Sequence, residues 1–86
     1  MSRATEVYSR EFDSVFFKLP SNVQSLAEAK IADLGSNLSR FPHHRLKGRG
    51  EYRLRAGAYR IIYEFDVEEN VVQLIAIGHR REVYKS

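Results

Sequence analysis

Hydrophobic residues recur at helical spacing in the first half of the chain. One set falls at positions i, i+3, i+4 and i+7 ahead of Pro20, a helix-ending residue: Phe12, Val15, Phe16 and Leu19. Ser21 is placed to cap a second helix, whose apolar face would hold Val23, Leu26, Ala27, Ile31, Leu34 and Leu38. The strand-forming residues 4–8, ATEVY, precede both helices. This half of the chain therefore predicts a short strand followed by a hairpin of two amphipathic helices.

The hydrophobic period changes to two from about residue 51 onward. Residues 52–56, YRLRA, place Arg53 and Arg55 opposite the apolar positions of a strand. Residues 59–66, YRIIYEFD, place Arg60 on the side opposite Tyr59, Ile61, Tyr63 and Phe65. Residues 71–78, VVQLIAIG, are nearly all apolar, which is typical of a central strand. Short turns at residues 57–58 and 68–70 join these three predicted strands.

The order of these elements predicts an α+β fold. A two-helix hairpin would pack on one face of a four-stranded, mainly antiparallel sheet. The side carrying Tyr59, Ile61, Tyr63 and Phe65 should meet the helices, so that Arg53, Arg55 and Arg60 point outward on the other face. Because 86 residues are enough for one modest core, we expect residues 1–86 to form a single domain.

Composition narrows the classes of function. Hydrophobic residues make up 43% and charged residues 29% of the chain, which are ordinary values for a globular protein. The absence of cysteine excludes disulfides, cysteine-based zinc sites and thiol nucleophiles. No apolar run approaches the roughly 18 residues that span a bilayer, and the N-terminus lacks the apolar stretch of a signal peptide. A cytoplasmic protein without a membrane partner is the expectation.

Positive charge is concentrated in the middle of the chain. The net charge is only +3, yet one stretch with a single acid, Glu51, holds Arg40, Arg45, Lys47, Arg49, Arg53, Arg55 and Arg60. Arginines on adjacent strands lie close together because strands are spaced by about 4.8 Å. Such a cluster suits a phosphate, to which the guanidinium group donates paired hydrogen bonds. The alternative is that these arginines are solvated and paired with nearby acids such as Glu64 and Asp66.

The last residues, GHRREVYKS, add candidate chemistry beside this cluster. His79 exchanges a proton near neutral pH, and Tyr84 offers a ring on which a base can stack. A histidine at a strand end is more often a plain surface residue, and three histidines without well-spaced carboxylates make a weak metal site. No catalytic serine triad, Walker loop or dinucleotide motif is present. A site rich in cations is still able to cleave RNA without a metal ion, because the 2′-hydroxyl of the RNA is the nucleophile.

Three motifs together resemble the RelE/ParE superfamily of bacterial and archaeal toxins. They are LKG at residues 46–48, YRLRAGAYRIIYEF at residues 52–65 and GHRREVY at residues 78–84. The resemblance implies a toxin held inactive by a cognate antitoxin in a hetero-oligomer. For RelE-like members it implies an endoribonuclease without a cofactor or metal, which cleaves mRNA on the ribosome.

The resemblance also assigns roles to residues. Arg60 and Arg80 match positions that contact the scissile phosphate, and Tyr84 matches a tyrosine that stacks on a substrate base. Arg53 stands where well-studied relatives have a lysine that helps to activate the 2′-hydroxyl. Arginine is a poor general base, so Glu51 or His79 would have to take the proton, or charge stabilisation would carry a slower reaction. General attraction to RNA would come from Arg45, Lys47, Arg49, Arg55 and Arg81.

Two other functions stay open at this point. A ParE-like toxin has the same fold but poisons DNA gyrase without ribonuclease chemistry. A catalytically weak module that only binds the antitoxin is the third possibility, because the lysine is lost at position 53.

Overall fold

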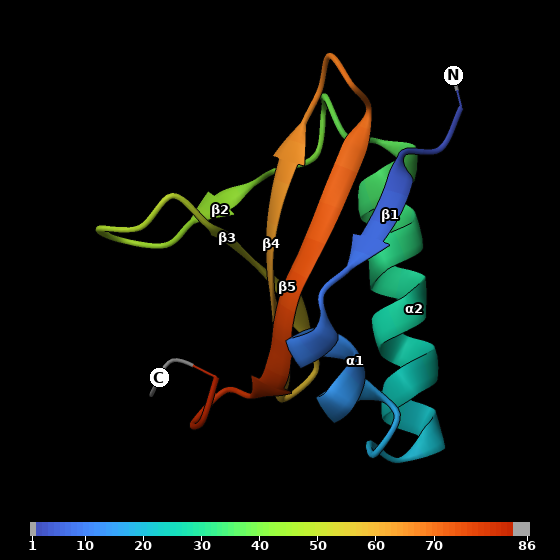
Figure 1. Cartoon of the computed structure of the whole chain (residues 1–86), viewed down its shortest axis with the longest axis vertical. Coiled ribbons are helices and arrows are strands. Elements are labelled where there is room, and N and C mark those ends of the chain that lie inside the picture. Colours follow the sequence, from blue (N-terminus) through green and yellow to red (C-terminus); the bar gives the residue numbers. More distant parts are fainter. Residues whose placement is uncertain (1, 84–86) are drawn as a thin grey trace.

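The chain forms one mixed sheet with two helices against it (Figure 1). The structure is a computed structural model, and it describes residues 2–83. In chain order the elements are β1 (Thr5–Tyr8), α1 (Arg10–Phe16), α2 (Ser21–Ser36), β2 (His44–Arg45), β3 (Tyr52–Ala56), β4 (Tyr59–Asp66) and β5 (Val71–His79). The predicted α+β class and its helical hairpin are confirmed.

The sheet has five strands in the order β1-β5-β4-β3-β2. The three pairings from β5 to β2 are antiparallel, while β1 runs parallel to β5. The sequence predicted four strands and missed β2, which contributes only the pairs His44↔Arg53 and Arg45↔Tyr52. A strand of two residues is too short to show a period of two, so no pattern could reveal it.

The ends of the helices differ from those predicted. Helix α1 is capped by Ser9, whose hydroxyl accepts a hydrogen bond from the Phe12 amide at 3.0 Å, and it ends before Leu19. Ser21 does not cap α2; Pro20 occupies that position and makes no side-chain cap. The Gln24 amide instead donates to the carbonyls of Phe16 (3.1 Å) and Leu19 (3.0 Å), which ties the start of α2 to the end of α1. Neither helix within residues 2–83 has the length and hydrophobicity to cross a membrane.

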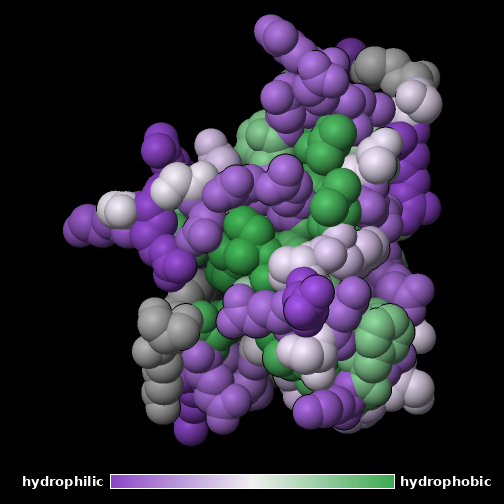
Figure 2. All heavy atoms as spheres, viewed as in Figure 1, coloured by the Kyte–Doolittle hydropathy of each residue, from purple (hydrophilic) through white to green (hydrophobic). Residues whose placement is uncertain are grey.

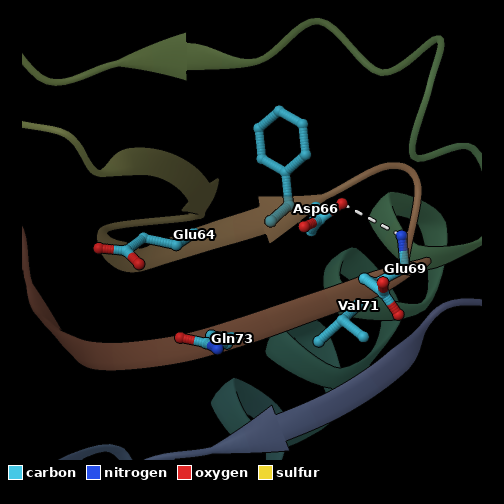
Figure 3. A pocket seen from close by; sticks show the side chains of 6 residues that line it. Glu64, Asp66, Glu69, Val71 and Gln73 are labelled. Carbon is cyan, nitrogen blue, oxygen red and sulfur yellow. Dashed lines mark hydrogen bonds between the residues drawn. The ribbon is translucent and has the colours of Figure 1, made fainter.

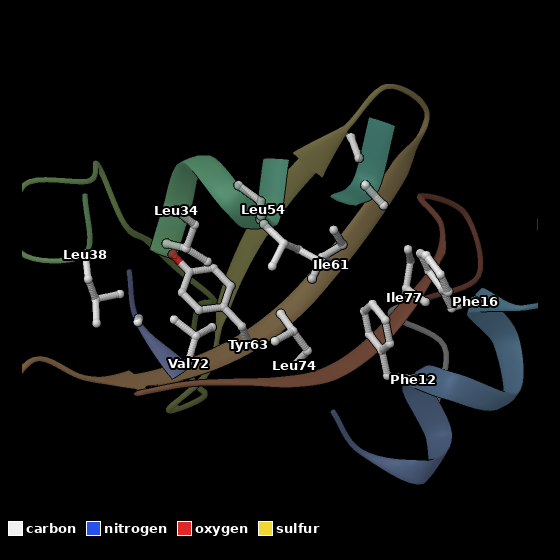
Figure 4. Close-up of a cluster of buried hydrophobic side chains, with 14 residues drawn as sticks. Phe12, Phe16, Leu34, Leu38, Leu54, Ile61, Tyr63, Val72, Leu74 and Ile77 are labelled. Carbon is white, nitrogen blue, oxygen red and sulfur yellow. The ribbon is translucent and has the colours of Figure 1, made fainter. Parts of the chain in front are cut away.

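The core lies between the helices and one face of the sheet (Figure 4). Leu54, Ile61, Tyr63, Leu74 and Ile77 point from the strands towards Phe12, Phe16, Ile31 and Leu34 of the helices. The register of β4 and β5 shifts between Ile62 and Tyr63, so Leu74 and Ile77 both reach the core although they are three positions apart. The predicted alternation is confirmed, with one addition: Ile62, on the opposite face, is buried too (3% exposed).

Candidate nucleic-acid interface

Three arginines share the sheet face that the helices leave open. Arg55 pairs with Arg60 across β3 and β4, and Arg60 pairs with Gly78 of β5. Arg53 lies in the same strand as Arg55, two positions away and hence on the same side, opposite Ile62. We call this surface, defined by Arg53, Arg55 and Arg60, the arginine face. Its position is the one that the period of two predicts.

The turn between β3 and β4 fixes Arg60 and Arg80 at one end of this face. The Arg60 Nη1 donates to the carbonyls of Gly57 (2.8 Å) and Tyr59 (2.9 Å). The Arg80 amide donates to the carbonyl of Ala58, between them, at 2.9 Å. Within residues 2–83 the hydrogen bonds of the Arg60 side chain involve only Nη1, so its Nε and Nη2 are left to donate to an anion.

Of the two candidate bases, His79 points to the other side of the sheet and Glu51 is held in an ion pair. His79 pairs with Tyr59, whose ring it meets edge-on at 5.7 Å, and this pairing directs it to the helix side of the sheet. Its Nδ1 accepts a hydrogen bond from the Arg81 amide at 3.3 Å. Glu51 forms an ion pair with Arg49, in which the Arg49 Nη2 lies 2.9 Å from the Glu51 Oε1. Among the described residues, no donor meets hydrogen-bond geometry at this oxygen. The structure therefore brings neither side chain beside Arg60.

The segment after β5 folds back towards the arginine face. The amides of Glu82 and Val83 both donate to the His79 carbonyl, at 2.8 and 3.0 Å. This turn places Val83 against Gly78, where an added Cβ would meet the Val83 Cβ at 3.4 Å. Because Gly78 pairs with Arg60, the chain enters its last residues beside the phosphate-binding candidates. Tyr84, the predicted stacking residue, lies outside the described residues.

A basic hairpin projects from the far end of β3 (Figure 1). It comprises residues 45–50 and carries Arg45, Lys47 and Arg49, all exposed. Hydrophilic residues cover it in Figure 2. Gly48 has a positive φ of 74°, which lets the chain reverse, and the Arg45 Nε donates to the Arg49 carbonyl at 3.1 Å. The hairpin thus presents cations at a distance from Arg60.

Acidic residues occupy the opposite end of the open face. Glu64, Asp66 and Glu69 line a pocket of about 320 Å³ beside the turn between β4 and β5 (Figure 3). These carboxylates are not arranged as a metal site within residues 2–83. The open face is therefore electrically polarised along β4, and an anionic ligand is directed to the end that holds Arg55 and Arg60.

His43 is a residue whose structural role the sequence did not reveal. Its Nδ1 lies 2.6 Å from the Tyr63 hydroxyl and its Nε2 lies 2.7 Å from the Leu38 carbonyl. Its ring stacks on Phe65 with centroids 3.8 Å apart. Burial, followed by the nearby Tyr52, raises the pKa of the Tyr63 phenol, so this hydroxyl keeps its proton. The sequence pattern gave no signal of this role, because the partners Tyr63 and Phe65 lie in β4, far along the chain from His43.

Comparisons with known proteins agree with this fold. The chain matches solved structures of RelE from Escherichia coli (27% identity, TM-score 0.73, 94% of this chain and 90% of that one) and of the RelBE2 toxin–antitoxin complex from Mycobacterium tuberculosis (26%, 0.72, 95% and 97%). The fold also matches the RelE–RelB complex of Pyrococcus horikoshii (19%, 0.75, 95% and 100%). A comparison with curated protein sequences gave no match. A family model described as the ParE toxin of the type II toxin–antitoxin system parDE matches residues 7–84, so the chain belongs to this family of toxins within the RelE/ParE superfamily.

Proposed function

We propose that this toxin is a ribosome-dependent mRNA endoribonuclease that works without a metal ion, and that the arginine face holds the scissile phosphate. The observation that carries the proposal is that the Arg60 side chain and the Arg80 backbone are bonded to one turn, beside Arg55. A guanidinium group held in place, as that of Arg60 is, lowers the energy of a transition state in which phosphate charge increases. The match to RelE of Escherichia coli at 27% identity supports the same activity.

The proposed reaction is an internal transesterification of RNA. The ribose 2′-oxygen forms a bond to phosphorus, the bond from phosphorus to the 5′-oxygen breaks, and the products are a 2′,3′-cyclic phosphate and a 5′-hydroxyl. One proton leaves the 2′-hydroxyl and one reaches the 5′-oxygen, so the reaction consumes no cofactor. Arg60 and Arg80 would stabilise the dianionic phosphorane, and Tyr84 would stack on an adjacent base.

The placement of His79 and Glu51 bears on proton transfer, because His79 points to the helix side of the sheet and Glu51 is paired with Arg49. Arg53 barely releases its proton, so it is suited to stabilise charge rather than to act as a base. We propose that solvent takes the 2′-proton and that the arginines supply most of the catalysis. General acid–base catalysis is typically worth about 10²–10⁴-fold, so cleavage should be slower than in an enzyme with a dedicated base.

Cleavage of mRNA on programmed ribosomes tests this function directly. Purified toxin should cleave in the presence of EDTA and leave a 2′,3′-cyclic phosphate, and Arg60→Ala should abolish most of that rate. Cleavage that requires added metal, or intact mRNA at toxin concentrations that stop translation, would exclude this mechanism.

Gyrase inhibition is the second candidate, and the family model favours it because that model describes ParE toxins. In this case the basic surface would contact the enzyme or its DNA, and no RNA would be cut. A supercoiling assay with purified gyrase separates the two candidates: loss of supercoiling with intact ribosomal mRNA supports the ParE-like function. A toxin inactive in both assays would be the catalytically weak antitoxin-binding module.

We also propose that a cognate antitoxin neutralises the toxin by laying an amphipathic segment against the helices. Tyr8, Phe16, Phe17 and Gln24 line a groove of about 290 Å³ between β1 and the two helices, and Phe17 is 71% exposed. Exposed aromatic clusters of this kind mark protein interfaces. Phe17→Glu should weaken the complex with the antitoxin, whereas binding unchanged in calorimetry would place the antitoxin elsewhere.

A further inference from the structure

The side chain of His43 connects the end of the helical layer to the sheet. It follows helix α2 in the loop that leads to β2, and it bonds Leu38 at the start of this loop and Tyr63 in the centre of β4. Tyr63 is fully buried, and Leu38 is 5% exposed. Both partners belong to the hydrophobic core, so the half-buried imidazole links this loop to the core through polar contacts.

The two hydrogen bonds define which ring nitrogen carries the proton. The Leu38 carbonyl accepts only, so Nε2 must donate to it. Nδ1 of the neutral ring is then an acceptor, and the Tyr63 hydroxyl donates to it. In this tautomer both ring nitrogens and the Tyr63 hydroxyl have a hydrogen-bond partner.

Aromatic rings enclose the imidazole on several sides. Phe65 stacks on it at 3.8 Å, and Phe41, Tyr52 and Tyr63 surround it with centroids 5.7 to 5.8 Å away. Tyr52 and Tyr63 are the titratable groups that face the ring from β3 and β4, and Phe41 and Leu38 face it from its own loop.

The chain that follows this link is the basic hairpin. His44 and Arg45 form the short strand β2, held to β3 by only two residue pairs, and Lys47 and Arg49 lie beyond it. Within residues 2–83 the hairpin makes few backbone hydrogen bonds, among them those from the Leu46 amide to Glu51 (2.9 Å) and from the Arg49 amide to Leu46 (3.1 Å). The orientation of the hairpin therefore depends on how firmly its base, at His43, is attached to the core.

We propose that His43 is a positioning residue that holds the basic hairpin in place through its hydrogen bonds to Leu38 and Tyr63. Loss of the imidazole would leave the hydroxyl of the fully buried Tyr63 without this partner and would detach the base of the hairpin from the core. The consequence for RNA binding rests on the proposed endoribonuclease function, but the attachment itself does not.

Hydrogen exchange of the backbone amides tests the attachment. His43→Phe keeps an aromatic ring and removes both hydrogen bonds, and His44→Phe is the matched control one residue along, where the side chain is exposed. We expect exchange at the Leu46 and Arg49 amides to rise about tenfold or more in His43→Phe and to stay at the wild-type rate in His44→Phe. Amides of β4 and β5 should stay protected. Unchanged hairpin exchange in His43→Phe, or an equal rise in both variants, would overturn the proposal.

A further variant separates the polar link from simple packing. Tyr63→Phe removes only the hydrogen bond to Nδ1 and keeps the volume of the core, so hairpin exchange should rise, but less than in His43→Phe. Hairpin exchange at the wild-type rate in Tyr63→Phe would show that this hydrogen bond does not hold the hairpin.

The final measurement concerns RNA. On programmed ribosomes His43→Phe should raise KM about fivefold or more with kcat nearly unchanged, because it loosens general contacts and leaves Arg60 and Arg80 in place. A drop confined to kcat would contradict positioning through the hairpin. If the wild type cleaves no RNA, the proposed function fails, while the exchange measurements still decide whether His43 holds the hairpin.

Discussion

Arg80 and Arg81 are adjacent and exposed, but only Arg80 is joined to the turn that holds Arg60. We expect Arg80→Ala to lower single-turnover cleavage of ribosome-bound mRNA by about 10² or more, the loss typical when one preorganised donor to developing charge is removed. Arg81→Ala is the matched control and should cleave ribosome-bound mRNA at nearly the wild-type rate, because Arg81 is expected to add only general attraction to RNA and no contact to the scissile phosphate. Equal rates for both variants would show that this segment adds only general charge and has no specific role in cleavage.

The buried phenol of Tyr63 predicts a dependence of stability on pH. Burial raises its pKa above that of an unfolded tyrosine, which is about 10. Its contribution to folding is therefore complete below about pH 10 and is lost as the pH rises through the pKa of the folded state. Tyr8, whose pKa is raised by burial and by its hydrogen bond to Glu6, adds to the same loss.

Urea unfolding of the Tyr8→Phe variant isolates the effect of Tyr63. The free energy of unfolding should fall between about pH 10 and pH 11.5, and the fall should be smaller when Tyr63→Phe is added. Lysines ionise in the same range but are common to both proteins. Parallel curves for the two proteins would show that ionisation of Tyr63 does not matter for stability.

At the scale of elements, α1 is held by one face only. Phe12 is 1% exposed and packs in the core, whereas Phe17, just past the end of the helix, is 71% exposed. Phe12→Ala should lower the free energy of unfolding by about 3–5 kcal/mol, since it removes apolar contacts and leaves a cavity. Phe17→Ala, the same chemical change at the surface, should lower it by less than about 0.5 kcal/mol. A similar loss for both would mean that α1 is not docked through Phe12.

Local periodicity explains which elements the sequence could predict. Strands β3, β4 and β5 and the core faces of the helices were predicted because each repeats one side-chain pattern over several residues, as in Tyr59, Ile61 and Tyr63. Strand β2 and the pairing of β1 with β5 depend on contacts between distant residues, which leave no local pattern. The cap at Ser21 failed because Gln24, bonded to α1, stabilises the start of α2 instead.

The same reasoning applies to the candidate site. The shared face of Arg53, Arg55 and Arg60 follows from a period of two and was predicted. His79 was expected near them as part of one cluster, yet alternation directs it to the other side of β5, next to Tyr59. The sequence gives the order of residues along a strand, but the face to which the last side chains point depends on the register with the neighbouring strand.

At the scale of the whole molecule, positive and negative side chains lie on different faces and at different ends of the sheet. The arginine face and the basic hairpin carry cations, the turn between β4 and β5 carries acids, and the helices carry a mixture. A molecule with this distribution attracts an anionic partner from one side and orients it before any specific contact forms. Net charge alone, which is +3, would give much weaker attraction and no preferred orientation.

This polarity predicts how binding responds to salt. Each cation that neutralises a phosphate of a single strand contributes about 0.7 to the slope of log affinity against log salt, through release of counterions. Replacing Lys47, Arg49 and Arg55 with glutamine should therefore reduce the slope for ribosome-bound mRNA by up to about 2. The cleaved phosphodiester should stay the same, because Arg60 and Arg80 are intact.

Arg10, Lys18 and Lys30 provide the matched control, since they are exposed on the helical side and their replacement with glutamine removes the same charge. If binding follows the basic side of the molecule, this second triple variant should keep the wild-type slope. Equal reductions in both variants would mean that net charge, and not its distribution, governs the attraction. A shifted cleavage position in the first variant would show that the hairpin and Arg55 place the substrate as well as attract it.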